Sequence, residues 1–203
     1  MSTTIEIAVY TVDDIDTATN QQTDVHAVLS TFDGYQQSVP LRAVEQMVLV
    51  DVVVWANDEA AQNAASQVQH DPRTKGFLAS IKEMIAFEHF EGPEQQKAKE
   101  ALAEISSAPF IELVLLSPIE IDDFRPAHAS LASRHLPAND DVISHLPLKS
   151  NSNAVAGDFI GWTSAEAHQK APEALASLDD VAAVFNPENT IVTMQSLTLS
   201  EAN

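Results

Sequence analysis

Two hydrophobic patterns alternate along the chain. Runs rich in β-branched and aromatic residues predict strands, and segments with apolar residues near helical spacing predict helices. In the first half, strands are expected over residues 5–12, 35–43, 47–56 and 83–90, with helices over residues 23–32 and after Trp55. The second half is expected to follow the same order and to close with a strand over residues 190–199.

Helix ends carry recognisable signals. Asp33-Gly34 is expected to stop the first helix, because glycine accepts the left-handed geometry of a helix end. Asn57-Asp58-Glu59 can cap the next helix, and residues 163–166, Thr-Ser-Ala-Glu, fit a capping box at the equivalent place in the second half.

The two halves share sequence as well as pattern. With an offset of 107, residues 38–62 align without a gap to residues 145–169, and eight of the 25 positions are identical. The recurring pairs include Pro40 and Pro147, Asp51 and Asp158, and Trp55 and Trp162. This is the mark of an internal duplication. We therefore predict a first α+β repeat over residues 1–92, a helical connector over residues 93–108 and a second repeat over residues 109–203.

Alternation along the strands groups side chains by face. Asp51 and Trp55 share one face of their strand with Leu49 and Val53, and Asp158, Ile160 and Trp162 share a face in the second copy. The opposite face of the strand over residues 47–56 is formed by four valines. We expect the valine face to pack against helices, which leaves the Asp/Trp face to look toward a partner sheet.

These features resemble a known family. The βαββαβ order, and a strand that ends in tryptophan before an Asx/Ser-x-Glu-Ala helix start, are similar to the antibiotic biosynthesis monooxygenase-like (ABM) domains of the dimeric α+β barrel superfamily. The resemblance implies an α+β chain of two tandem ferredoxin-like βαββαβ repeats, with antiparallel sheets that pack face to face as a pseudo-dimeric α+β barrel. A tandem copy would be an internal pseudo-dimer, and further homo-oligomerisation is possible.

Composition narrows the class of partner. The formal net charge of −20 over 203 residues repels phosphate backbones and anionic lipid headgroups, so no nucleic acid and no membrane partner is expected. No apolar stretch approaches the roughly 20 residues that span a bilayer, and we expect a cytoplasmic protein. With no cysteine, disulfides and thiolate chemistry are excluded.

Seven residues are candidates for a ligand pocket. A carboxylate beside an indole in a partly dry cavity suits small-molecule binding, and a histidine at matching places in the two copies could serve as acid or base. Each residue also has a purely structural interpretation. Tryptophan commonly fills a hydrophobic core, and a histidine on a helix is commonly hydrogen-bonded within the core or partly exposed. The candidates are Tyr10, His26, Asp51, Trp55, His128, Asp158 and Trp162.

No metal and no cofactor is expected. The histidines show neither an HxH nor an HExxH arrangement. Haem-degrading relatives carry an asparagine on the first strand and an iron-binding histidine in the second helix, whereas residues 76–81 and 183–186 of this chain contain no histidine. The resemblance therefore leaves a cofactor-independent oxygenase.

Two functional hypotheses remain. The first is a cofactor-independent monooxygenase-like enzyme that acts on a small aromatic molecule in the barrel cavity, with an Asp or His as proton acceptor. The alternative is a non-catalytic small-molecule binding or interaction module on the same barrel.

Overall fold

The computed structural model describes residues 2–152 and 154–200. These residues fold into two compact units, residues 2–100 with 197–200 and residues 101–152 with 154–196. The helix α4 (Gln95–Ser106) occupies the segment where the sequence predicts a connector, and it begins in the first unit and ends in the second.

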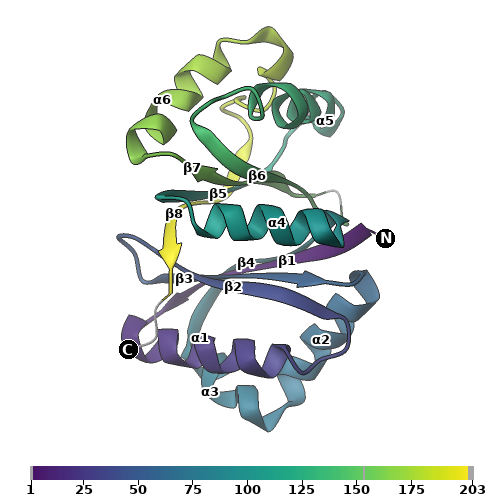
Figure 1. Cartoon of the computed structure of the whole chain (residues 1–203), viewed down its shortest axis with the longest axis vertical. Helices are drawn as coiled ribbons and strands as arrows, with labels where there is room; N and C mark the ends of the chain where they lie inside the picture. The colour runs from purple at the N-terminus through teal and green to yellow at the C-terminus, as the bar shows by residue number, and fades with distance from the viewer. Residues whose placement is uncertain (1, 153, 201–203) are drawn as a thin grey trace. The chain divides into compact units, whose positions relative to one another are not determined.

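The first unit follows the predicted order with one addition. Its four strands are antiparallel in the order β4-β1-β3-β2, and the last residues of β8 pair with the free side of β2. The elements are β1 (Ser2–Val12), α1 (Ile15–Leu29), β2 (Tyr35–Ala43), β3 (Val48–Trp55), α2 (Asp58–His70), a 3-10 turn (Pro72–Thr74), α3 (Lys75–Ser80) and β4 (Ile81–Glu94). The turn and α3 are the addition. All three helices lie on one side of this sheet (Figure 1).

The second unit repeats this plan. Its strands follow the order β8-β5-β7-β6, and α5 and α6 lie on one side of the sheet (Figure 1). The elements are β5 (Phe110–Ser117), α5 (Ile121–Ser130), a π-helical turn (Leu131–His135), β6 (Val142–Lys149), β7 (Ala156–Trp162), α6 (Ala165–Ala176), a 3-10 turn (Asp179–Val181) and β8 (Thr190–Leu199).

Strand register confirms the internal duplication. Pro40 pairs with Asp51 on β2 and β3, and Pro147 pairs with Asp158 on β6 and β7. Each hairpin also has an irregularity at the same place, between positions 35 and 37 in the first unit and between positions 142 and 144 in the second. The predicted fold class, an α+β chain of two tandem ferredoxin-like repeats, is confirmed.

Helix boundaries agree with the caps better than with the apolar pattern. Helix α1 begins at Ile15, eight residues before the predicted start, because the Asp14 carboxylate accepts hydrogen bonds from the amides of Asp16 and Thr17. Asn57 caps α2 as predicted. The N-cap of α6 is Ser164 and not the first residue of the predicted capping box, Thr163.

The expected assignment of sheet faces is wrong. Val53 and Trp55 pack against α1 and α2, in a core cluster with Val25, Leu29 and Ala61. The Asp/Trp face of β3 therefore lies under the helices of its own unit. Alternation identified which residues share a face, but every residue of β3 is buried, so hydrophobicity alone could not tell which face the helices cover.

Candidate functional site

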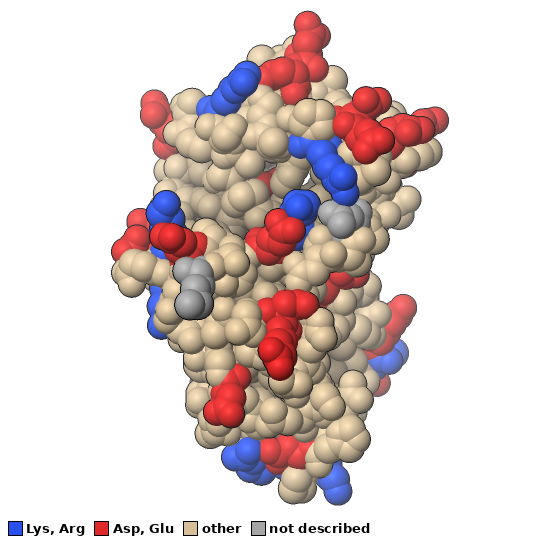
Figure 2. Space-filling view, turned by 90° about the vertical axis from the view of Figure 1, so that its right-hand side faces the viewer, with Lys and Arg blue, Asp and Glu red and all other residues tan. Residues whose placement is uncertain are grey.

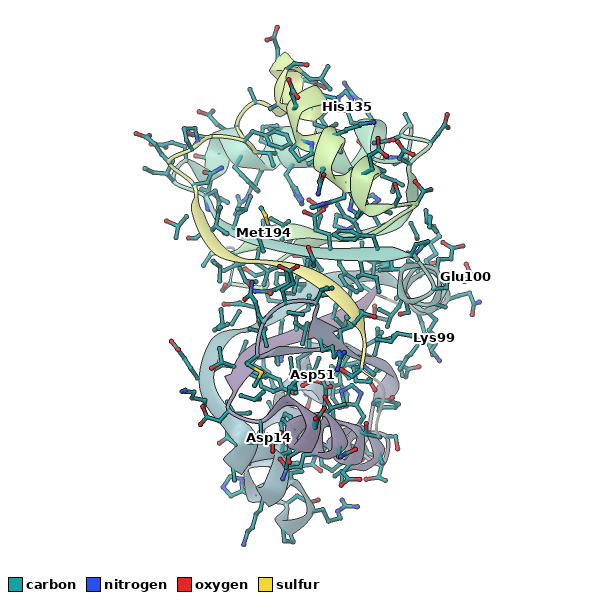
Figure 3. The ribbon with its side chains drawn as sticks, turned by 90° about the vertical axis from the view of Figure 1, so that its left-hand side faces the viewer. Asp14, Asp51, Lys99, Glu100, His135 and Met194 are labelled. Carbon is teal, nitrogen blue, oxygen red and sulfur yellow. The ribbon has the colours of Figure 1, made fainter. Side chains whose placement is uncertain are left out.

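Asp51 is the centre of a buried polar cluster in the first unit. β3 directs its carboxylate toward α1, and Figure 3 shows Asp51 between the sheet and that helix. Asp51 Oδ1 lies 2.6 Å from His26 Nε2 and accepts a hydrogen bond of 2.9 Å from Gln22 Nε2. Because Gln22, His26 and Asp51 are all at most 9% exposed, these bonds compensate for removing polar groups from water.

The cluster continues through the other nitrogen of the imidazole. His26 Nδ1 lies 2.7 Å from Ser38 Oγ on β2, and Ser38 Oγ lies 2.8 Å from Tyr35 Oη. Both ring nitrogens of His26 are thus engaged within the protein. Such a chain of bonds fixes the ring and leaves neither nitrogen free for a ligand.

Tyr10 and Trp55 lie nearby, and Trp55 Nε1 has no hydrogen-bond partner among the described residues. Burial raises the pKa of Tyr10 well above its ordinary value, and the negative charge of Asp51 raises it further. Tyr10 makes an edge-to-face contact with Phe77, and Trp55 makes one with Tyr35. Trp55 is a fully buried core side chain, which agrees with the structural alternative considered for it in the sequence analysis.

A cavity of about 250 Å³ lies beside this cluster in the first unit. Its lining includes the carboxylates of Glu6 and Asp51 and apolar side chains such as Val53, Val68 and Phe87. Glu6 bonds to His89 of β4, with 2.9 Å between Oε2 and Nε2, and this contact follows from the direct pairing of the two residues across β1 and β4.

In the second unit, His128 of α5 contacts the equivalent aspartate. His128 Nε2 lies 3.1 Å from Asp158 Oδ2 and 3.0 Å from the carbonyl oxygen of Gly157, and the ring stacks on Phe124. Two acceptors at Nε2 place the ring proton there, so that in the neutral imidazole Nδ1 is the basic nitrogen. Asp158 Oδ1 is buried and accepts no hydrogen bond from the described residues.

Two opposing effects act on the pKa of His128. Burial disfavours the imidazolium, but the Asp158 charge and the hydrogen bonds to Asp158 and Gly157 outweigh burial, and the pKa is raised. His145 of β6 has the opposite balance. Burial lowers its pKa, and His145 Nε2 has no partner among the described residues.

A second carboxylate in this unit holds the tryptophan in place. Trp162 Nε1 donates a hydrogen bond of 3.0 Å to Glu112 Oε2, and His168 Nε2 of α6 lies 2.9 Å from Glu112 Oε1. The hydrogen bond to Glu112 raises the pKa of His168 against the effect of burial. Trp55 has no such bond, so the two tryptophans have diverged in their environments.

These groups surround a cavity of about 300 Å³. Glu112, His128, Asp158 and Trp162 are lining residues, and most of the remaining wall is apolar, from side chains such as Leu131, Leu175 and Met194. Figure 3 labels Met194 on β8. A volume near the lower end of the range for ligand sites, with apolar walls and a few polar groups, suits a small and mostly apolar molecule.

The structure thus brings the predicted residues together in two groups. Tyr10, His26 and Asp51 gather in the first unit, and His128, Asp158 and Trp162 gather in the second; Trp55 packs in the core beside the first group. The sequence interpretation missed several polar partners. Ser38 and His145 occupy the same aligned position in the two repeats, and this could have identified them as site residues. The roles of Gln22, Glu112 and His168 become visible only when strand register and helix placement are known.

Surface charge and metal-ligand geometry add little to this site. Acidic side chains are scattered over the face shown in Figure 2 and do not gather in one cluster. Among residues 2–152 and 154–200, no group of three or more acidic or histidine side chains could hold a metal ion. In the same part of the chain, no helix combines the length and apolar character needed to cross a membrane.

Comparison with known proteins gives matches in structure alone. No family model matches the sequence, and no curated protein sequence matches it. A solved structure described as an anthrone oxidase-like protein has a TM-score of 0.60 at 14% identity, with 96% of this chain and 93% of that chain covered. A candidate monooxygenase of Fusobacterium nucleatum has a TM-score of 0.61 at 8% identity, with 98% and 93% covered.

Chlorite dismutases are matched over a similar length. A mutant of the enzyme from Candidatus Nitrospira defluvii, in complex with cyanide, has a TM-score of 0.63 at 12% identity, with 98% of this chain and 91% of that chain covered. At these identities the likeness establishes a shared fold, the tandem ferredoxin-like α+β fold of chlorite dismutases and of monooxygenase-like proteins.

Proposed function

We propose that this chain is a monooxygenase-like enzyme of the ABM type that works without a cofactor. Its substrate is a small aromatic molecule with an acidic C–H or O–H group, bound in the cavity of the second unit. The observation that carries the proposal is the His128–Asp158 pair, which lines an apolar cavity: His128 is bonded to Asp158 through Nε2, and the buried Asp158 Oδ1 has no hydrogen-bond partner among the described residues.

Binding follows from the composition of the wall. Apolar side chains and the ring of Trp162 would bury the aromatic body, with a favourable free energy of about 25 cal/mol for each Å² of apolar surface removed from water. Asp158 Oδ1 is an acceptor in need of a donor, so a hydroxyl on the ligand would satisfy it. Trp162 is itself held by Glu112, which keeps the indole in one orientation.

Proton transfer is the chemical task of His128. Asp158 and the Gly157 carbonyl hold the Nε2 proton, so Nδ1 can accept a proton from the substrate. Asp158 then stabilises the imidazolium that forms. Because the pKa of His128 is raised, the neutral ring forms at a higher pH than it does in an ordinary histidine.

The reaction balances with molecular oxygen as oxidant. His128 removes a proton from an activated methylene, the carbanion transfers electrons to O₂, and the methylene becomes a carbonyl as one water is released. One oxygen atom enters the product and the other enters the water. The structural likeness to an anthrone oxidase-like protein and to monooxygenase-like proteins supports this class of reaction.

The test is oxygen consumption with anthrone, measured with an oxygen electrode under metal chelation. The wild-type chain should consume about one O₂ per carbonyl formed, and His128→Gln should lose most of the rate, on the order of 10²-fold or more. His26→Gln changes the equivalent histidine of the first unit and should keep the rate within a few fold. Equal rates in the two variants, or none above background in the wild type, would overturn the proposal.

A further inference from the structure

The first unit holds a cavity of its own that the proposed reaction does not use. We infer that this cavity is a second small-molecule site, which binds an apolar molecule bearing a hydroxyl or amine donor and does not transform it. The inference goes beyond the proposed function, because it concerns the other copy of the repeat.

The two cavities occupy equivalent places in the two repeats. Three residues that line the first cavity have a counterpart 107 positions later that lines the second cavity. The pairs are Asp51 and Asp158, Val68 and Leu175, and Phe87 and Met194. Their volumes are also close, about 250 Å³ and about 300 Å³. Voids larger than a water molecule are few in a packed domain, so a space kept at one place in both copies requires an explanation beyond loose packing.

Each cavity is lined in part by apolar side chains that water reaches. Met84 and Phe87 of β4 are 43% and 44% exposed, and at the matching positions Ile191 and Met194 of β8 are 58% and 51% exposed. Exposed large apolar residues that adjoin a cavity are typical of a ligand entrance. An apolar ligand in the first cavity would cover Met84 and Phe87.

The polar groups of the first cavity select for a donor. The two charged side chains in the wall, Glu6 and Asp51, are both carboxylates. An ionised carboxylate accepts hydrogen bonds and donates none. Gln22 and His26 both bond to Oδ1 of Asp51, and a hydrogen bond to the same carboxylate helps to raise the pKa of Tyr10. A hydroxyl or amine of the ligand would add a further donor to this carboxylate.

The same contacts argue against chemistry at this site. His26 does not line the cavity, and its two ring nitrogens are bonded to Asp51 and Ser38. In the second unit the position of Ser38 is occupied by His145, and His128 lines the cavity. The first unit thus keeps the ligand space and gives up the free base, which is the divergence expected of a site that binds without turnover.

Stoichiometry of 1-naphthol binding, measured by isothermal titration calorimetry and ligand-observed NMR on the full chain, tests the inference. Two equivalents should bind to the wild type. Val68→Trp fills the first cavity from α2, Leu175→Trp is its counterpart on α6, and each should reduce the stoichiometry to one. With Leu175→Trp, 1-naphthol should bind at least about tenfold more tightly than naphthalene, the gain of one hydrogen bond to a charged acceptor. A third titrant, 1-naphthylmethylamine, provides an amine donor and should show the same preference over naphthalene.

The outcomes separate this inference from the proposed function. A single equivalent in the wild type that Val68→Trp leaves unchanged would overturn the second site, whatever the oxygen consumption. Two equivalents without oxygen consumption by any variant would overturn the proposed reaction and leave the second site standing. Naphthalene that binds to Leu175→Trp as tightly as the two donor ligands would overturn the role of Asp51. If Val68→Trp is unfolded by circular dichroism, Phe87→Ala, on an exposed part of the wall, should weaken binding to the first cavity by severalfold, and an unchanged affinity would contradict the inference.

Discussion

Gly157→Ala is the substitution whose effect the structure determines most sharply. A Cβ at this position would lie 1.8 Å from the carbonyl oxygen of Val114 and 2.8 Å from its carbonyl carbon, on the neighbouring strand β5. Real Cβ atoms essentially never come within 3.0 Å of such a neighbour, so β5 and β7 would have to separate locally by more than 1 Å. Backbone hydrogen bonds near 2.9 Å do not survive that separation.

The cost has two parts. Overpacking of a tight site typically costs about 1–3 kcal/mol, and two backbone hydrogen bonds lost near the Leu115–Gly157 pair cost about 0.5–1.5 kcal/mol each. We expect a loss of about 4 kcal/mol in the free energy of unfolding, a large part of the 5–15 kcal/mol typical of folded proteins. The Gly157 carbonyl also accepts a bond from His128, so the variant should disturb the proposed base as well.

Urea denaturation followed by circular dichroism and fluorescence measures this cost. Gly76→Ala is the matched control. There the nearest heavy atom to the new Cβ is the side-chain nitrogen of Gln21 at 3.3 Å, which can move, and alanine in place of glycine within α3 should stabilise by about 0.5–1 kcal/mol. If Gly157→Ala unfolded within about 1 kcal/mol of the wild type, the described approach of β5 to β7 would be refuted.

Three further predictions concern the second unit. In an NMR titration, the pKa of His128 should lie above 6.5 in the wild type and below it in Asp158→Asn, because burial then acts without the opposing charge. The stability contributed by protonation of His128 is fully present below pH 6.5 and is lost as pH rises through the raised pKa. The free energy of unfolding should therefore differ less between pH 6 and pH 9 in Asp158→Asn than in the wild type. Trp162→Phe should cost about 1.5–3 kcal/mol more than Trp55→Phe in urea denaturation, since only Trp162 donates to a carboxylate, that of Glu112; equal costs would contradict the described bond.

Much of the fold could be predicted from the sequence, because the duplication was visible. The alignment of Asp51 with Asp158 placed both aspartates on matching strands, and their cross-strand partners are indeed Pro40 and Pro147. The histidine at a similar place in each first helix proved to contact that aspartate in both units. Periodicity and repetition are local properties, so a single sequence suffices to read them.

The sequence could not determine which face of each sheet the helices cover. Both faces of β3 are buried, and valine and tryptophan are equally suited to a core, so the expectation that the Asp/Trp face looks away from the helices was wrong. Nor could it give Glu112 as the acceptor for Trp162, since that bond depends on the pairing of β5 with β7. Contacts of this kind arise from register and helix position, which spacing along the chain does not encode.

Hydrogen–deuterium exchange at the methylene carbon of anthrone, under anaerobic conditions in D₂O, tests the central claim most directly. Without oxygen the reaction stops at proton abstraction, so exchange reports on the base alone. The account predicts that the wild type and His26→Gln accelerate exchange, that His128→Gln does not, and that the acceleration grows as pH rises through the raised pKa of His128. Exchange that is no faster than in buffer, or equally fast in His128→Gln and the wild type, would contradict the assignment of His128 as the base of the second cavity.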